Sequence, residues 1–265
     1  MNSLQRTLVA KTAYDHGWEI IEERPAEGAV HLTSAHHRAE ATVNRAEPDA
    51  GWNVQFHQPR LCEELRQTDG IQSTGNGGFL AHDERALGYL LAQAARLART
   101  LPDLPCLQYE SAVSQALKAL TGPTAATEVE RTVRQRIGQQ VYRQSLIDYW
   151  GGACAVTGLA IPELLRASHA VPWADCPSDA DRLNVFNGFL LAAHLDALFD
   201  RHLMTFHSSG EILLAPVVTE EARGLLNLTA DLRLRWLSPA HLPFLAEHRH
   251  SFHALHRESS SPNYH

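Results

Sequence analysis

The chain has 265 residues and a mass of 29.4 kDa, which suits two domains of ordinary size. Hydrophobic residues make up 44% and charged residues 20%, and these proportions exclude a disordered or collagen-like chain. The net charge of −7 argues against a protein that coats nucleic acid non-specifically. The chain shows neither an apolar run of the roughly 18 residues that a membrane helix needs nor a signal-peptide layout, so we expect a cytoplasmic protein without a membrane partner.

The cysteines are few and widely spaced. Cys62, Cys106, Cys154 and Cys176 include no pair at the two-residue spacing of a zinc ribbon or a redox motif. This spacing argues against a disulfide scaffold and against a cysteine-based zinc fold.

Residues 1–122 predict an α+β domain. Leu4 and Leu8 have helical spacing within residues 3–15. Short β-like segments follow, separated by turn-forming and polar residues, at 17–23, 29–35, 40–45 and 51–57. They indicate an antiparallel meander. A glycine-rich loop is expected at 70–79, and a one-sided apolar pattern then predicts a helix over 84–101.

A hinge-like segment, TGPTAAT, predicts a domain boundary near residue 122 and thus a second domain over 123–265. A short helix up to Leu120 is expected just before it. After it, valine and isoleucine recur every four residues and predict a helix that ends near Trp150. The other face of that helix carries Arg131, Arg134, Arg136 and Arg143. A solvated face and a DNA contact both explain these arginines.

The segment 151–206 has the order strand, turn, strand and helix. SHAVPW predicts a short strand that presents His169, and the pair Asn187-Gly188 predicts a tight turn. Residues 189–203 have helical spacing, with Leu191, Leu195, Leu198 and Phe199 as the expected buried stripe. This order would bring a histidine, an asparagine and helix carboxylates together.

Four motifs in this segment resemble those of HNH endonucleases. They are C-x-x-T-G at 154–158, L-L-R-A-S-H at 164–169, N-G-x-L-L at 187–191 and D-x-L-F-D at 196–200. The resemblance extends upstream to RQRIGQQVYR and downstream to FLAEHRHSF, over about residues 127–255. It implies a ββα-metal nuclease domain with flanking helices behind an N-terminal α+β domain that would recognise a target or sense a signal.

The resemblance also implies roles for individual residues. His169 matches the first histidine and would be the general base. Asn187 matches the central asparagine, which either holds the base and its loop or joins the metal shell. Asp196 and Asp200 are four residues apart on one helix face, and their oxygens would bind a divalent metal ion, Mg²⁺ or Mn²⁺. His194, about 200° around the helix from Asp196 by the ~3.6-residue period, is the alternative ligand.

Residues beside the expected centre affect the metal and the substrate. Ser168 stands where many HNH enzymes have an acidic or histidine ligand, which predicts a thinner metal shell completed by water. Arg166 and Arg182 flank the centre and would clamp the scissile phosphate, although each could equally pair with a nearby aspartate.

The C-terminal run is rich in histidine. His248, His250, His253 and His256 lie close enough in sequence to chelate an ion from one helix face. The resemblance instead implies a terminal helix with its apolar side chains packed inward. We favour the helix.

We therefore expect a metal-dependent DNA endonuclease of restriction or phage defence. The alternative is a catalytically silent or latent HNH frame that binds DNA or a partner protein, because the metal shell is atypical and the charge acidic. An activating ligand or protein acting through residues 1–122 would fit a latent nuclease. A homodimer would cut both strands with one site per chain.

Overall fold

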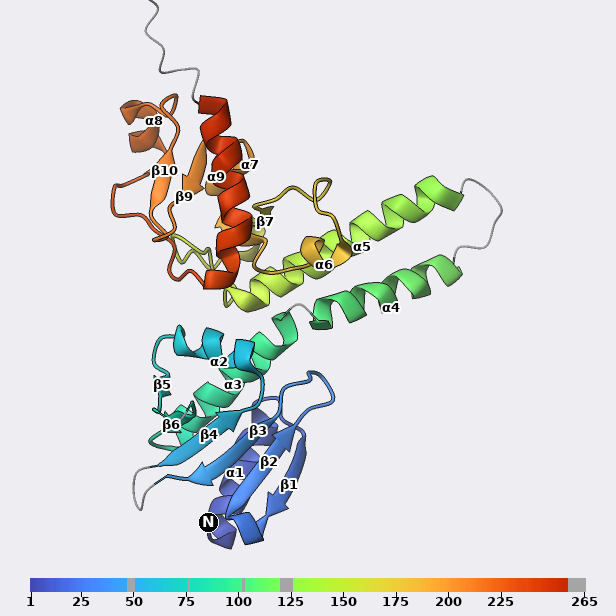
Figure 1. Ribbon diagram of the computed structural model, residues 1–265, viewed down its shortest axis with the longest axis vertical. Helices are drawn as coiled ribbons and strands as arrows, with labels where there is room; N and C mark the ends of the chain where they lie inside the picture. Colours follow the sequence, from blue (N-terminus) through green and yellow to red (C-terminus); the bar gives the residue numbers. More distant parts are fainter. Residues whose placement is uncertain (47–50, 76, 102, 120–125, 257–265) are drawn as a thin grey trace, which may run out of the picture. The chain divides into compact units, whose positions relative to one another are not determined.

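The computed structural model describes residues 1–46, 51–75, 77–101, 103–119 and 126–256 (Figure 1). Contacts divide the chain into two compact units, an N-terminal unit up to Leu101 and a C-terminal unit from residue 102 onward. The chain mixes helices and strands, which confirms the predicted α+β class. The hinge expected near residue 122 falls at 120–125, outside the described residues.

The N-terminal unit contains the predicted helix and meander. Its first elements are α1 (Ser3–Asp15), β1 (Ile20–Arg24), β2 (Ala29–Thr33), β3 (Ala41–Arg45) and β4 (Trp52–Phe56). The strands pair in sequence order, each antiparallel to the next. Alternate side chains such as Val30, Val43 and Val54 are fully buried, as expected for a sheet with one face on the core.

The rest of the unit contains elements that the sequence pattern did not predict. They are α2 (Pro59–Arg66), β5 (Gln72–Ser73) and β6 (Phe79–Ala81), and they precede the predicted helix α3 (Glu84–Thr100). The sheet order is β1-β2-β3-β4-β6-β5. The glycine-rich segment predicted as a loop therefore includes a short edge strand. Trp18 fixes α3 to this core, since its Nε1 donates to the Leu91 carbonyl at 3.0 Å.

The C-terminal unit begins with a pair of helices, α4 (Asp103–Ala119) and α5 (Ala126–Tyr149). The two pack against each other, so contacts group α4 with the C-terminal unit. We expected only a short helix there, but α4 begins at Asp103, because Pro105 lies in its first turn, where proline is tolerated. None of the helices within the described ranges has both the length and the apolarity needed to cross a membrane.

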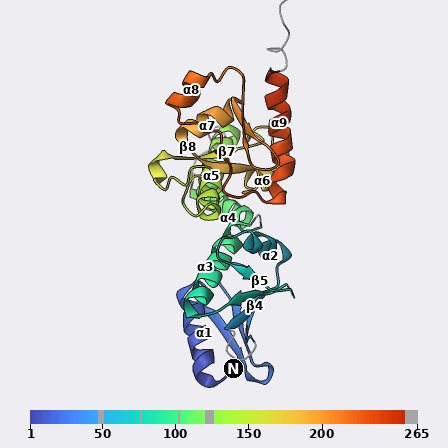
Figure 2. The ribbon, with the colours of Figure 1, turned by 90° about the vertical axis from the view of Figure 1, so that its left-hand side faces the viewer.

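The remaining elements of the C-terminal unit form two two-stranded antiparallel sheets and the helices beside them (Figure 2), and the first of these sheets along the chain is termed the hairpin. They are the 3₁₀ turn η2 (Pro162–Leu164), β7 (Leu165–His169), α6 (Asp179–Arg182), β8 (Gly188–Ala192), α7 (Ala193–Asp200), β9 (Met204–Phe206), β10 (Ile212–Leu214), α8 (Glu220–Leu225), the 3₁₀ turn η3 (Pro239–His241) and α9 (Leu242–His256). Helix α5 lies beside both strands of the hairpin.

One predicted element is wrong in its extent. The helix predicted from residue 189 begins only at Ala193, because residues 188–192 form β8 and pair with β7. All five residues of β8 are buried. A short run that is apolar on every side is equally compatible with a buried strand and a buried helix. Leu191 is therefore buried in a strand, while Leu195, Leu198 and Phe199 form the buried side of α7.

Candidate functional site

The hairpin and helix α7 place the predicted residues around one point. His169 is the last residue of β7, and it pairs with Gly188 at the start of β8. A Cβ atom on Gly188 would lie 2.0 Å from the carbonyl oxygen of Ser168, so only glycine allows the two strands to approach here. Helix α7 follows β8 directly and contacts β7. Its carboxylates therefore return toward the strand that carries His169.

The half-buried imidazole of His169 is held on several sides. Its Nε2 atom lies 2.9 Å from the carbonyl oxygen of Arg182. Because a carbonyl only accepts hydrogen bonds, Nε2 carries the proton and Nδ1 has a free lone pair. Burial lowers the pKa of His169, while the Arg182 carbonyl and the charge of Asp200 act in the opposite direction. The ring is therefore neutral near pH 7, which suits a general base.

Asn187 is fully buried, and its side chain holds the loop that follows β7. Its Oδ1 accepts from the Val171 amide at 2.8 Å. Its Nδ2 donates to the carbonyls of Val171 and Asp181 and to the sulfur of Cys176. The amide thus holds together the loop after β7. This loop leads to Arg182, whose carbonyl binds His169. This geometry matches the first of the two roles considered for it, holding the base and its loop.

Helix α7 presents the two predicted carboxylates differently. Asp196 is half-buried, and its Oδ1 accepts a hydrogen bond from the buried hydroxyl of Ser168 on β7. Asp200 is exposed, and its charge acts on His169. Both residues thus border the end of the strand that carries His169.

The donor set fits some metals better than others. Within the described part of the chain, no group of three or more histidine, cysteine, aspartate or glutamate side chains could hold an ion. A closed zinc cage of four protein ligands does not fit this arrangement. Mg²⁺ is commonly bound by one or two carboxylates together with water and substrate phosphate, and Asp196 with Asp200 can supply that many.

His194 lies apart from these residues. It is exposed on α7 and lines a pocket of about 430 Å³ together with Thr157, Asn227 and other residues. That pocket includes neither predicted aspartate. The placement agrees with the expected angle between His194 and Asp196 on the helix.

The two predicted phosphate-binding arginines have different environments. Arg182 donates to the Asp179 carboxylate and to the carbonyls of Trp173 and Cys176, at 2.6–3.0 Å. Its guanidinium therefore braces the loop. Arg166 is exposed, and one of its nitrogens donates to the carbonyls of Glu163 and Leu165. Arg166 is thus the more accessible of the two to a phosphate.

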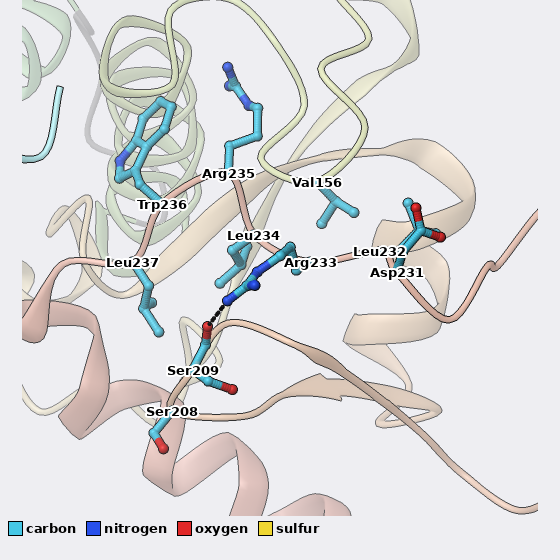
Figure 3. A pocket seen from close by; sticks show the side chains of 10 residues that line it. All are labelled: Val156, Ser208, Ser209, Asp231, Leu232, Arg233, Leu234, Arg235, Trp236 and Leu237. Carbon is cyan, nitrogen blue, oxygen red and sulfur yellow. Dashed lines mark hydrogen bonds between the residues drawn. The ribbon is translucent and has the colours of Figure 1, made fainter. Parts of the chain in front are cut away.

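A pocket of about 620 Å³ elsewhere in the C-terminal unit contains none of the predicted site residues. It lies along the segment 231–237 and is closed by Val156, Ser208 and Ser209 (Figure 3). Arg233 points across it and donates to the Ser209 carbonyl at 3.0 Å. This contact links the segment to the loop between β9 and β10.

The C-terminal histidines have structural contacts. His248 is buried, and its Nδ1 and Nε2 atoms lie within 3.0 Å of the Thr205 hydroxyl and the Phe199 carbonyl. His256 bonds to the carbonyl of His202 at 2.8 Å. Leu245 and Phe252 are buried in α9. These residues form the inward-packed terminal helix that we favoured.

Sequence reasoning did not single out two aromatic residues that contact His169. The ring of Tyr142 stacks on the imidazole with 3.8 Å between centroids, and Trp173 meets it edge-on at 5.8 Å. Tyr142 lies in the upstream stretch RQRIGQQVYR and Trp173 ends the strand segment SHAVPW, but neither stretch assigns a role to its aromatic ring.

Comparison with known protein families gives one match for the C-terminal unit. The family of HNH endonucleases matches residues 154–207. These residues include β7, α6, β8, α7 and β9 but not α5. No curated protein matches the chain.

Proposed function

We propose that this protein is a metal-dependent DNA endonuclease of restriction or anti-phage defence, because residues 154–207 match the family of HNH endonucleases. One observation carries the proposal: the Nε2 atom of His169 is fixed on the Arg182 carbonyl, which leaves Nδ1 to accept a proton. The reaction would be hydrolysis of a phosphodiester bond in DNA.

In this proposal His169 takes a proton from the attacking water molecule. Burial keeps the pKa of His169 low, so the imidazole is neutral and ready to accept. After the transfer, the hydrogen bond from Nε2 to the Arg182 carbonyl stabilises the imidazolium. Asn187 keeps the loop, and with it the Arg182 carbonyl, in place during the step.

HNH nucleases generally use a divalent metal ion, and Asp196 and Asp200 would hold it here. We expect Mg²⁺ or Mn²⁺, because the donors are carboxylate oxygens. Such an ion, when bound, stabilises the charge that develops on the phosphate and on the leaving oxygen. The Ser168 hydroxyl would orient Asp196 as a ligand.

DNA would contact the exposed side of this site. Arg166 is accessible and would bind a backbone phosphate. Arg182 would act on the substrate only indirectly, through the loop that its guanidinium braces. The N-terminal unit would choose the target or receive an activating ligand or protein, and a homodimer would cut both strands.

The second candidate is a silent or latent HNH module that binds DNA or a partner protein. Two observations favour it. Ser168 occupies a position where an acidic ligand would strengthen metal binding, and the chain has a net charge of −7. Such a module would bind DNA in a salt-dependent way without cutting it.

A plasmid-nicking assay separates the two candidates. The full chain is incubated with plasmid in EDTA, Mg²⁺, Mn²⁺, Ni²⁺ or Zn²⁺, and His169→Ala and Asp196→Ala are compared with the wild type. His207→Ala is the matched control, because His207 is exposed on the same unit and lies outside the site. Metal-dependent nicking lost only in the first two variants supports the nuclease. Equal nicking by His169→Ala and the wild type would sink it, and binding without nicking would favour the silent module.

A further inference from the structure

Helix α5 precedes the residues that match the HNH family, yet it forms one wall of the candidate site. Gly138 and Tyr142 are four residues apart, so they share one face of the helix. Both are buried. Tyr142 contacts His169, the proposed base, and Gly138 lies against Trp173 beside it.

Tyr142 contacts the base itself. Its side chain is 1% exposed, and its ring stacks on the His169 imidazole with an interplanar angle of 17°. Its hydroxyl donates to the backbone carbonyl of Asn187 at 2.9 Å. A ring fixed at its distal end by a hydrogen bond and on its face by a neighbour has little freedom to tilt. Tyr142 is therefore a rigid platform for the imidazole.

Gly138 makes room for the second aromatic wall. A Cβ atom on Gly138 would lie 2.2 Å from Cη2 of Trp173, so the indole sits directly on the backbone of α5. Trp173 meets the edge of the imidazole at 87°, and the Arg182 guanidinium lies 5.9 Å from the indole centroid. The same helix face thus seats both aromatic rings that contact His169.

We propose that Tyr142 is a positioning residue for His169, and that α5 is part of the catalytic unit. The Arg182 carbonyl fixes one nitrogen of the ring, but a single hydrogen bond leaves the ring free to rotate about that contact. The stack on Tyr142 removes this rotation and aims Nδ1 in one direction. The claim that Tyr142 contributes to catalysis rests on the proposed nuclease function. The claim that Tyr142 holds the imidazole rests on the ring contacts alone.

Kinetics test the catalytic meaning. Tyr142→Phe keeps the stacking ring and removes the hydroxyl, whereas Tyr142→Leu removes the ring. Gln139→Ala changes the exposed side of the same helix and is the matched control. With saturating metal, Tyr142→Leu should lower kcat by ~10- to 100-fold at nearly constant KM, while Tyr142→Phe and Gln139→Ala stay within about threefold of the wild type.

Three kinetic results would overturn the inference. The first is a folded Tyr142→Leu protein with wild-type kcat. The second is an equal loss in Tyr142→Phe and Tyr142→Leu, which would assign the effect to the hydroxyl and not to the stack. The third is a change confined to KM, which would indicate substrate binding. Circular dichroism of each variant establishes that it is folded before kinetics are compared.

A nuclear magnetic resonance measurement does not depend on cleavage. In protein with ¹⁵N-labelled histidine, long-range ¹H–¹⁵N spectra report which ring nitrogen carries the proton, and His169→Gln identifies the His169 signals by their loss. We expect the Nε2-protonated form in the wild type and in both Tyr142 variants, because the Arg182 carbonyl sets the tautomer. The ring signals should be single and sharp in the wild type and in Tyr142→Phe, and broadened or multiple in Tyr142→Leu, because the ring then takes several orientations. Single, sharp ring signals in Tyr142→Leu would overturn the inference. If the wild type does not cut DNA, the proposed function fails while this spectrum still decides the role of Tyr142.

Discussion

The two units bury their polar side chains in different ways. In the N-terminal unit, the buried side chains of Thr100 and His37 each bond to one backbone carbonyl, those of Leu97 and Gly17. In the C-terminal unit, buried Ser168 and Asn187 flank one hairpin and connect, directly or through the loop, to the surroundings of His169. Burying a polar group costs desolvation free energy unless the group is hydrogen-bonded. When several such groups lie close together, this cost falls on one small region of the structure. In the C-terminal unit, Ser168 and Asn187 are thus buried next to the candidate site.

The largest effect that this contrast predicts concerns the base. His169→Ala should lower the nicking rate by roughly 10²- to 10⁴-fold, because it removes the proton acceptor. His31→Ala changes a half-buried histidine on the sheet of the N-terminal unit, and it should leave the rate per bound DNA near that of the wild type. Single-turnover nicking at saturating protein measures both. A comparable loss of nicking rate in the two variants would contradict the assignment of catalysis to the C-terminal unit.

The second prediction concerns acid stability of the C-terminal unit. Burial lowers the pKa of His241 to about 3, and this ring stacks on Phe189 with an angle of 10°. Below about pH 6.5, His241 is protonated in the unfolded chain but stays neutral in the folded protein. The free energy of unfolding therefore falls as the pH drops from about 6.5 to about 3. A shift of this size corresponds to roughly 3 to 5 kcal/mol of unfolding free energy.

Denaturant unfolding at pH 7, 5.5 and 4.5, followed by tryptophan fluorescence, measures this loss. Trp150 and Trp236 report on it, because both belong to the aromatic cluster around His241. His241→Phe keeps an aromatic ring there and cannot titrate, so it should reduce the pH dependence; buried His248, with its pKa lowered to about 4, accounts for part of what remains. The same slope in variant and wild type would show that other groups cause the acid sensitivity.

The third prediction concerns the wall of the site on α5. Gly138→Ala should destabilise the C-terminal unit by about 1 to 3 kcal/mol, because the new methyl group overlaps Trp173. Alanine in a helix is intrinsically better than glycine by about 1 kcal/mol, so the sign of the change is informative. Thermal unfolding measures it, with Gln139→Ala as the exposed control. An increase in stability would mean that Trp173 moves aside without loss.

The sequence predicted the elements whose apolar residues follow a clear period. Helices α1, α3 and α5 and the strands of the meander lie close to their expected ranges. The leucines of α3 are buried, but Leu4 of α1 is 79% exposed and Val129 of α5 is 42% exposed, so in these two helices the apolar period predicted the helix without marking its buried side. It failed at residues 189–192, where every residue is apolar and the period carries no information. It also missed α2 and the early start of α4, where proline and polar residues weaken the pattern.

The candidate site was predictable in its residue types but not in its bonds. The spacing of Asp196 and Asp200 and the strand position of His169 placed these residues near one another, as the structure has them. The partner of His169 is the main-chain carbonyl of Arg182. A carbonyl is present at every position, so nothing in the sequence marks this one. Likewise, the guanidinium of Arg182 turned toward its own loop because three acceptors lie within reach.

The smallest predicted effect concerns the contact between β7 and α7. Ser168→Ala removes the hydroxyl that donates to Asp196, and it should raise the Mg²⁺ concentration needed for half-maximal nicking by about tenfold. The rate at saturating Mg²⁺ should change less, because the hydroxyl orients a ligand and does not touch the water that attacks. Ser208→Ala, an exposed serine of the same unit, is the control.

A Mg²⁺ titration of nicking distinguishes two meanings of this serine. If Ser168 only fills the space where many HNH enzymes have a ligand, its loss leaves the Mg²⁺ requirement unchanged, and metal binding depends on the aspartates alone. If it orients Asp196, the requirement rises while the metal preference stays the same. The second outcome would show that β7, the strand that carries His169, also orients a metal ligand on α7 through Ser168.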